Sequence, residues 1–252
     1  MATLKAFYKM ELKALSREKI ALFFMIVLPV VLTVVFGGTF GSEQTQYGEG
    51  ILGIDTVVPV NIVFLIANTG LMGIPITLIE LKVQGVIKRY ITYPTTYKTY
   101  FSALVLAFAV VSVASTFLFS AISFFVYNAT WRMDFSQFLI FLGVYFLIIF
   151  IFDGIGFLIA LLIKAPRTAQ LVASGSFMIL LFTSGVSLPV EALPIYVQRL
   201  AHMFPMYHAI EVMQMLWVGE FSFAAQGGNI LYLVGSAVLL YFILRRVQIK
   251  WG

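Results

Sequence analysis

The chain has 252 residues, of which 61% are hydrophobic, 16% aromatic and 11% charged, with a formal net charge of +5. A soluble domain carries roughly twice this share of charged residues, so the composition places the chain among membrane proteins. The absence of cysteine excludes disulfides, thiolate metal sites and cysteine nucleophiles. In a membrane protein, excess basic residues mark the cytoplasmic edge, so we expect no nucleic-acid partner.

The first 19 residues have a basic amphipathic pattern. At about 100° per residue the apolar side chains share one face, interrupted by Glu11, and the Lys and Arg side chains lie beside and opposite them. This pattern predicts an interfacial helix over residues 1–19 that binds inner-leaflet lipids. A solvated, charged lead-in is the alternative. The charges continue to Lys19 and a run of full spanning length follows, so we expect this segment to be retained rather than cleaved as a signal peptide.

Six long apolar segments predict membrane-spanning helices, because each can cross about 30 Å of hydrocarbon. They lie near Ile20–Thr39, Val60–Ile79, Ser102–Val126, Phe138–Ile163, Ala169–Leu188 and Asn229–Val247. The runs are continuous rather than alternating, which favours an all-α membrane protein over a β-barrel. We therefore predict a single domain over residues 1–252.

The positions of Lys and Arg predict the orientation. Of the 16 basic residues, all except Arg132 and Arg199 precede the first span, follow the second or fourth span, or lie in the C-terminal tail. The positive-inside rule places these segments in the cytoplasm, so we expect both termini inside, in the plasma or inner membrane. The first outer loop carries Glu43, Glu49 and Asp55 without Lys or Arg, as this orientation requires.

The inner loop over residues 82–98 has a sequence pattern that a simple connecting loop would not need. Gly85 allows a bend after the second span, Lys88 and Arg89 lie beside apolar residues at helical spacing, and Pro94 ends the segment. We interpret it as a short helix along the cytoplasmic surface that presents one face to a partner. The alternative is a surface loop anchored by Lys and Tyr side chains.

Polar residues inside the predicted spans are candidates for a translocation path. Asp153 is the acidic residue well inside a span, and Gly156 and Ala160 on its face allow close approach of another helix. Asp153 is therefore either a carboxylate that packs helices together or a site for substrate or protons. The other candidates are Asn68, Thr69, Ser176 and Thr183.

The outer stretch over residues 189–220 interrupts the apolar sequence. Pro189, Pro194 and Pro205 predict two short helices that dip into the membrane from outside and return, as an outer gate that also holds His208 and Glu211. An amphipathic outer loop is the alternative. Two histidines and one glutamate are too few for a closed metal site.

No catalytic or nucleotide-binding motif is present in the sequence. There is no phosphate-binding loop, no Rossmann fingerprint and no nucleophile elbow. We therefore expect no enzyme activity, metal or cofactor on this chain, and any ATP and Mg²⁺ to be bound by another subunit.

Two segments together resemble the ABC-2 family of ABC transporter permeases. The run SGVSLPVEALP…L…FPMYHAIE is similar to the family's hairpin signature, and Glu80, Gly85, Lys88-Arg89 and Pro94 are similar to its E…G..KR….P segment. The resemblance, with the amphipathic lead-in and six spans, extends over the whole chain. One departure is Gln214, where many members carry arginine.

The resemblance implies a half-transporter. Two copies would pair as a homodimer. Each copy would dock on a separate ATPase subunit through Glu80, Gly85, Lys88, Arg89 and Pro94. It favours export of a hydrophobic drug or lipid-like compound, as in the drug-resistance branch. Export of polysaccharide or lipid-linked glycan is the second reading, followed by sodium or haem export. A secondary transporter that uses Asp153 without an ATPase is the alternative from another class, although the sequence lacks an inverted repeat.

Overall fold

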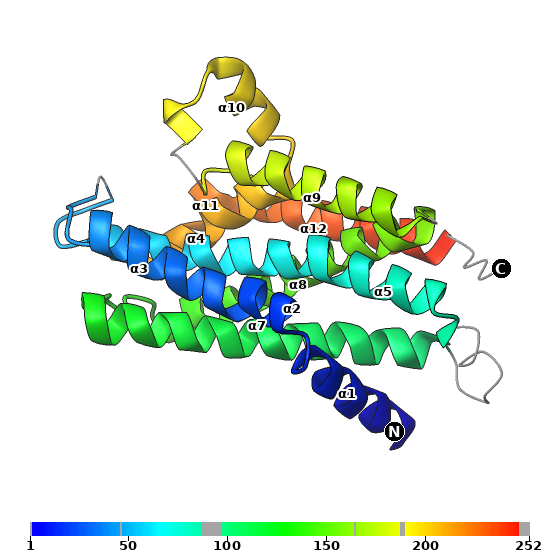
Figure 1. Ribbon diagram of the computed structural model, residues 1–252. Helices are drawn as coiled ribbons and strands as arrows, with labels where there is room; N and C mark the ends of the chain where they lie inside the picture. Colours follow the sequence, from blue (N-terminus) through cyan, green and yellow to red (C-terminus); the bar gives the residue numbers. More distant parts are fainter. Residues whose placement is uncertain (1, 46, 87–96, 164, 187–189, 247–252) are drawn as a thin grey trace.

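The computed structural model describes every residue except 1, 46, 87–96, 164, 187–189 and 247–252. The described part is a bundle of helices and connecting loops, in which strand pairing is limited to one isolated bridge between Gln44 and Leu52. The long helices run roughly side by side, and α1 projects at an angle from one end (Figure 1). The predicted all-α class is confirmed.

The helices follow one another with short connections. In chain order they are α1 (Ala2–Leu15), α2 (Lys19–Leu22), η1 (Phe23–Val27), α3 (Leu28–Phe40), α4 (Gly53–Asn68), η2 (Thr69–Gly73), α5 (Ile74–Val83), α7 (Tyr97–Tyr127), α8 (Phe135–Leu162), α9 (Pro166–Thr183), η3 (Val190–Ala192), α10 (Ile195–Ala201), α11 (Pro205–Trp217) and α12 (Phe223–Arg246). Here η1 and η2 are π-helical turns that continue directly into their neighbours, and η3 is a 3₁₀ turn.

Among the described residues, five helical stretches are long and apolar enough to cross a membrane: Phe23–Phe40, Gly53–Val83, Thr99–Tyr127, Phe135–Leu162 and Phe223–Arg246. They overlap five of the six predicted spans, so the chain is a multi-pass membrane protein. The remaining predicted span, Ala169–Leu188, overlaps α9, whose first turns carry Arg167 and Gln170. The last span begins at Phe223, earlier than its apolar run indicates.

Local sequence features fix several helix ends. Asp134 precedes α8, and its carboxylate accepts a hydrogen bond of 2.7 Å from the Gln137 backbone N–H, while Gln137 Oε1 accepts one from the Asp134 backbone N–H. The bond that the carboxylate accepts from the Gln137 backbone, and those it accepts from Ser136, lower the pKa of Asp134. Pro205 occupies the first position of α11, where its missing N–H costs nothing. Gly219 ends that helix with φ of +81°, a conformation that favours glycine.

The core is centred on α4, whose side chains are almost all buried. One large apolar cluster joins α4 to α8, α9 and α11, and a smaller one joins α1 and α5 to the first half of α7. The short helix α11 packs against α4, α8 and α12 and buries Met206, Met213 and Trp217. It therefore lies within the bundle, whereas α10 projects from its side (Figure 1).

Helix α1 packs its apolar face on the beginning of α7. Phe7 contacts the Tyr100 ring with centroids 5.5 Å apart, and Leu15 is buried. Glu11, which interrupts this face in the sequence, is also buried, and its Oε1 accepts a 2.7 Å hydrogen bond from the Tyr100 hydroxyl. Burial raises the pKa of Glu11, and the bond from Tyr100 opposes that rise in part.

The segments predicted to be cytoplasmic lie together. Helix α1, the end of α5, the start of α7 and the C-terminal end of α12 occupy one end of the bundle, and the loop after α3 occupies the other (Figure 1). This grouping is what the distribution of Lys and Arg requires. Which end faces the cytoplasm stays a prediction.

Candidate functional site

Two pockets lie along the face formed by α4, η2 and α5. In the bundle these helices lie between α3 and α9 (Figure 1). We call the two pockets the α11 pocket and the α2 pocket after the helices beside them. Each lies within the size range of small-molecule sites, about 300–1,000 Å³. Neither was anticipated as a pocket by the sequence pattern.

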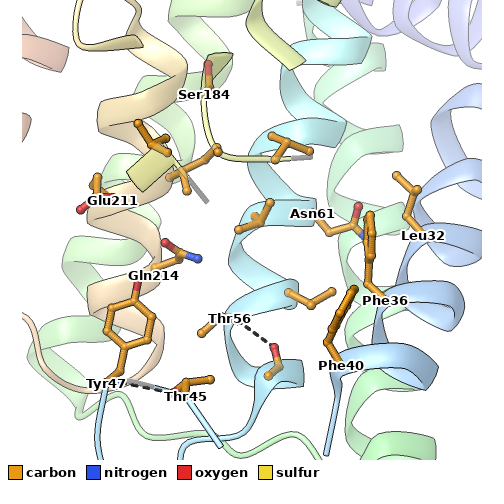
Figure 2. A pocket seen from close by; sticks show the side chains of 17 residues that line it. Leu32, Phe36, Phe40, Thr45, Tyr47, Thr56, Asn61, Ser184, Glu211 and Gln214 are labelled. Atoms are coloured by element: carbon orange, nitrogen blue, oxygen red, sulfur yellow. Dashed lines mark hydrogen bonds between the residues drawn. The ribbon is translucent and has the colours of Figure 1, made fainter. Parts of the chain in front are cut away.

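The α11 pocket has a volume of about 380 Å³. Leu32, Phe36 and Phe40 of α3 form one wall, and Gln214 of α11 extends from the opposite wall toward α4 (Figure 2). Ser184, just after α9, is buried at the rim, and its Oγ has no hydrogen-bond partner among the described residues. The pocket therefore combines a large apolar wall with polar side chains such as Asn61, Glu211 and Gln214, which suits an amphipathic molecule.

The residues of the predicted outer hairpin differ in their relation to this pocket. Pro194 and Pro205 begin α10 and α11, and Pro189 lies outside the described residues. Glu211 lines the α11 pocket together with Gln214. His208 does not: its Nε2 lies 2.9 Å from the His202 carbonyl oxygen and its Nδ1 lies 2.6 Å from Asn229 Oδ1. His208 therefore fixes α11 to α12, and its ring stacks on Tyr232 with centroids 4.0 Å apart.

The α2 pocket is larger, about 720 Å³, and lies toward the end where α1 joins the bundle. Both described π-helical turns face it, Phe24 and Met25 from η1 and Thr69, Met72 and Gly73 from η2. Single π-helical turns inside α-helices are rare in proteins overall, and those that occur are often found at functional sites. Met72, Phe108 and the two η1 side chains give this pocket an apolar interior.

Side chains satisfy the backbone where η1 departs from α-helical geometry. Asn68 Nδ2 donates a 3.1 Å hydrogen bond to the Phe24 carbonyl oxygen, and Ser115 Oγ donates one of 2.7 Å to the Met25 carbonyl oxygen. Thr69 Oγ1 lies 3.0 Å from the Ile66 carbonyl oxygen and 3.2 Å from Ser112 Oγ. The predicted path residues Asn68 and Thr69 therefore line the α2 pocket and also fix its wall.

Charged residues surround the mouth of the α2 pocket. Arg17, Glu18 and Lys19 come from the segment between α1 and η1, and Glu80 comes from α5. Partial burial raises the pKa of Glu18, and the nearby negative charge of Glu80 raises it further. Two carboxyl groups and two basic groups thus line the same pocket.

Asp153 lies away from both pockets. It is buried on α8 against η2, where a side chain at Gly70 would meet the Asp153 backbone and its Oδ1. Gly156, one turn further, lies against the Gly70 carbonyl oxygen. Asp153 Oδ2 has no hydrogen-bond partner among the described residues. The carboxyl group is thus enclosed by a close helix contact, and its role stays a prediction.

The remaining predicted site residues fall outside the pockets or outside the described residues. Thr183 is buried and donates a 2.8 Å hydrogen bond to the Ile179 carbonyl oxygen, whereas Ser176 is half-buried on α9. In the predicted coupling segment, Gly85 follows α5 with φ of +71°. Lys88, Arg89 and Pro94 are outside the described residues.

Two buried polar residues were missed from the sequence. Asn61 lines the α11 pocket, and its Nδ2 donates to the Pro29 carbonyl oxygen at 2.8 Å and to Thr33 Oγ1 at 2.7 Å. Asp55 is fully buried and accepts hydrogen bonds from Leu52 N and from the backbone and hydroxyl of Thr130. Asn61 could have been found as Asn68 was, as an amide in an apolar run. The burial of Asp55 could not be predicted from its neighbours in the sequence, because its partner Thr130 lies 75 positions away.

The described residues contain no group of three His, Cys, Asp or Glu side chains arranged to hold a metal ion. The comparison with known families gives a positive result: the model of the ABC-2 type transporter matches residues 2–217, from α1 through α11. The chain belongs to the ABC-2 type transporter family. As a member, it is a permease subunit of an ABC transporter, a family whose permeases typically work with an ATPase subunit. Among curated proteins, none matches the chain significantly.

Proposed function

We propose that this ABC-2 permease is the membrane subunit of an ATP-driven exporter that moves a hydrophobic or lipid-like compound out of the cytoplasm or inner leaflet. The observation that supports it most is that the two pockets follow one another along the face formed by α4, η2 and α5, the first between α3, α4 and α11 and the second between η1, η2 and α5. A substrate could occupy them in turn while its apolar surface stays away from water.

The walls of the pockets support a hydrophobic substrate. Phe36 and Phe40 in the α11 pocket, and Phe24, Met72 and Phe108 in the α2 pocket, are large apolar side chains. Aromatic rings and flexible thioethers accommodate apolar molecules of varied shape. Hydroxyl, amide and charged side chains also line both pockets. The preference for a drug or lipid over a glycan therefore rests on these large apolar groups.

A second copy of the chain would close this face. The face is open in the single chain, and α3 and α9 expose large apolar residues on either side of it, including Val31, Val35, Met178 and Phe182. Two copies related by a two-fold axis would place these faces together and enclose one path between them. We therefore propose a homodimer.

The hairpin and α9 complete the proposed membrane arrangement. At about 1.5 Å per residue, the 18 residues of α9 reach about 27 Å, close to the thickness of the hydrocarbon layer. If α9 is counted as a span, the chain crosses the membrane six times and both termini lie on the same side of it. Because α11 is packed within the bundle beside the α11 pocket, we propose that α10 and α11 form the outer gate.

A secondary transporter driven by protons finds less support. Asp153 lines neither pocket and lies against the backbone of η2. A carboxyl group that exchanges protons across a membrane needs a connection to water on each side in turn.

Co-purification with the candidate ATPase subunit tests the proposal. We expect a stable complex in detergent with the native chain and loss of that complex in the double variant Lys88→Glu/Arg89→Glu, because the coupling segment would then repel its partner. The matched control is Arg245→Glu/Arg246→Glu, which reverses a basic pair at the end of α12. ATP-dependent movement of a hydrophobic dye in proteoliposomes is then measured for the native complex. Absence of any complex from a well-folded native chain would contradict the ATP-driven mechanism.

A further inference from the structure

The charges around the α2 pocket are balanced and unpaired. Arg17 and Lys19 are positive, and Glu18 and Glu80 are negative. None of these four side chains forms an ion pair within the described part of the chain, although all four line one pocket. A cluster that served only to hold α1 and α5 together would pair its opposite charges directly.

The carboxyl groups of Glu18 and Glu80 line the same pocket, so two negative charges lie near each other at this mouth. A cation held between them would relieve the repulsion between these charges, and an anion near Arg17 and Lys19 would be attracted in the same way. A purely anionic ligand would meet the carboxylates, and a purely cationic one would meet the two basic groups. The arrangement therefore favours a ligand that carries both charges.

The interior of the pocket requires a different chemistry from its mouth. Met25, Met72 and Phe108 give it a large apolar surface, to which Asn68, Thr69, Thr77 and Gln170 add amide and hydroxyl groups. Ile76 of α5 adds to this apolar surface. The pocket has a volume of about 720 Å³, which is ample for an extended hydrocarbon or aromatic body. A ligand that fits both parts has a charged head at the mouth and an apolar body inside.

We propose that the α2 pocket binds a zwitterionic amphiphile, with its ammonium group at Glu18 and Glu80 and its anionic group at Arg17 and Lys19. This inference rests on the proposed function and specifies the substrate class that the exporter accepts. The apolar body of the ligand lies between η1 and η2, against Met72 and Phe108. A zwitterionic phospholipid of the inner leaflet and another zwitterionic amphiphile share this chemistry.

Equilibrium binding of three single-chain probes to the purified full chain tests the inference. The probes carry the same labelled acyl or alkyl chain: lysophosphatidylethanolamine is zwitterionic, lysophosphatidylglycerol is anionic, and an alkylamine is cationic. We expect Arg17→Gln and Glu18→Gln each to weaken binding of the zwitterionic probe about fivefold, as for one charge-assisted contact. Arg17→Gln alone should weaken the anionic probe, and Glu18→Gln alone the cationic one.

The control is Lys13→Gln, which removes an exposed charge on α1 that does not line the pocket. It should leave binding of the zwitterionic probe unchanged, and the thermal stability of every variant is checked alongside. The inference is overturned if Glu18→Gln leaves binding of the zwitterionic probe unchanged or strengthens it, or if all variants match Lys13→Gln. An added phosphate-free probe, an alkyl sulfobetaine, distinguishes the sources: failure to bind narrows the ligand to a phospholipid, and binding supports the wider class.

Binding is measured without an ATPase subunit, so the two proposals can fail separately. Probe binding without any ATPase complex would contradict only the proposed ATP-driven function. Conversely, a stable ATPase complex that exports a dye while no probe binds would contradict only the inference about the α2 pocket.

Discussion

Glu11 shows how one buried carboxyl group can make the docking of α1 depend on pH. Its pKa is raised above 4.5 by burial, so the folded protein binds the proton more tightly than the unfolded chain. The stability that this proton provides is complete below pH 4.5 and is lost as the pH rises through the pKa of the folded state. The ionised form is left with the Tyr100 hydroxyl as its hydrogen-bond donor.

We therefore predict that Glu11→Gln removes this pH dependence. The amide keeps an acceptor for Tyr100 and carries no charge, so the variant should be more stable than the native chain at pH 7, and the difference should vanish toward pH 4.5. Thermal unfolding midpoints of the variant and the native chain, recorded from pH 4.5 to 7.5, measure this difference in stability. Glu43→Gln, at an exposed position far from α1, should show no such convergence, and a constant difference for Glu11→Gln would contradict the prediction.

Single residues were the hardest to interpret from the sequence. Glu11 looked like a defect in an amphipathic face, because its partner Tyr100 is 89 positions away and helical periodicity records only neighbours on the same helix. Asn68 and Thr69 were recognised as polar residues in an apolar run, and both line a pocket. Asn68 also supports the backbone of η1, which no pattern indicated because a π-helical turn has no distinctive sequence.

At the scale of elements, α8 and η2 approach each other through glycine. A Cβ at Gly156 would collide with the Gly70 carbonyl oxygen and lie 3.1 Å from Pro75 Cδ. We predict that Gly156→Ala costs about 1–3 kcal/mol of stability, because one of the two backbones must move. Thermal unfolding followed by size-exclusion chromatography measures the loss of folded protein.

Gly143→Ala is the matched control, since it lies on the same helix and a Cβ there meets no atom within 4 Å. Alanine favours a helix over glycine by about 1 kcal/mol, so this variant should be as stable as the native chain or more so. Equal midpoints for the two variants would show that α8 and η2 are not in backbone contact.

Helices were predicted better than their ends. Five apolar runs became spans because their length and hydropathy are properties of the sequence itself. The start of α4 at Gly53 was missed. Its cap is the Asp55 carboxylate, which accepts from Leu52 N and is held in place by the Thr130 N–H of a distant loop. Likewise the prolines correctly indicated two short helices after α9, but burial of α11 among α4, α8 and α12 depends on tertiary packing.

At the scale of the whole molecule, the open face between α3 and α9 predicts how two copies meet. If a two-fold axis passes through this face, α3 of one copy runs beside α9 of the other. Val35 and Met178 are about equally exposed, 51% and 50%, and each lies five residues before the end of its helix. They should therefore lie at a similar depth and close together across the interface.

The chain has no cysteine, so introduced cysteines are unique. We predict that a chain with Val35→Cys, co-expressed with a differently tagged chain with Met178→Cys, forms a covalent dimer with a short bis-maleimide. Because each chain carries one cysteine, the product can arise only between copies. The control pairs Val35→Cys with Leu231→Cys, which is 72% exposed near the corresponding end of α12 and would face lipid. Efficient cross-linking of the control but not of the α3–α9 pair would show that the copies meet through another face, and the two pockets would then open to lipid rather than to a shared path.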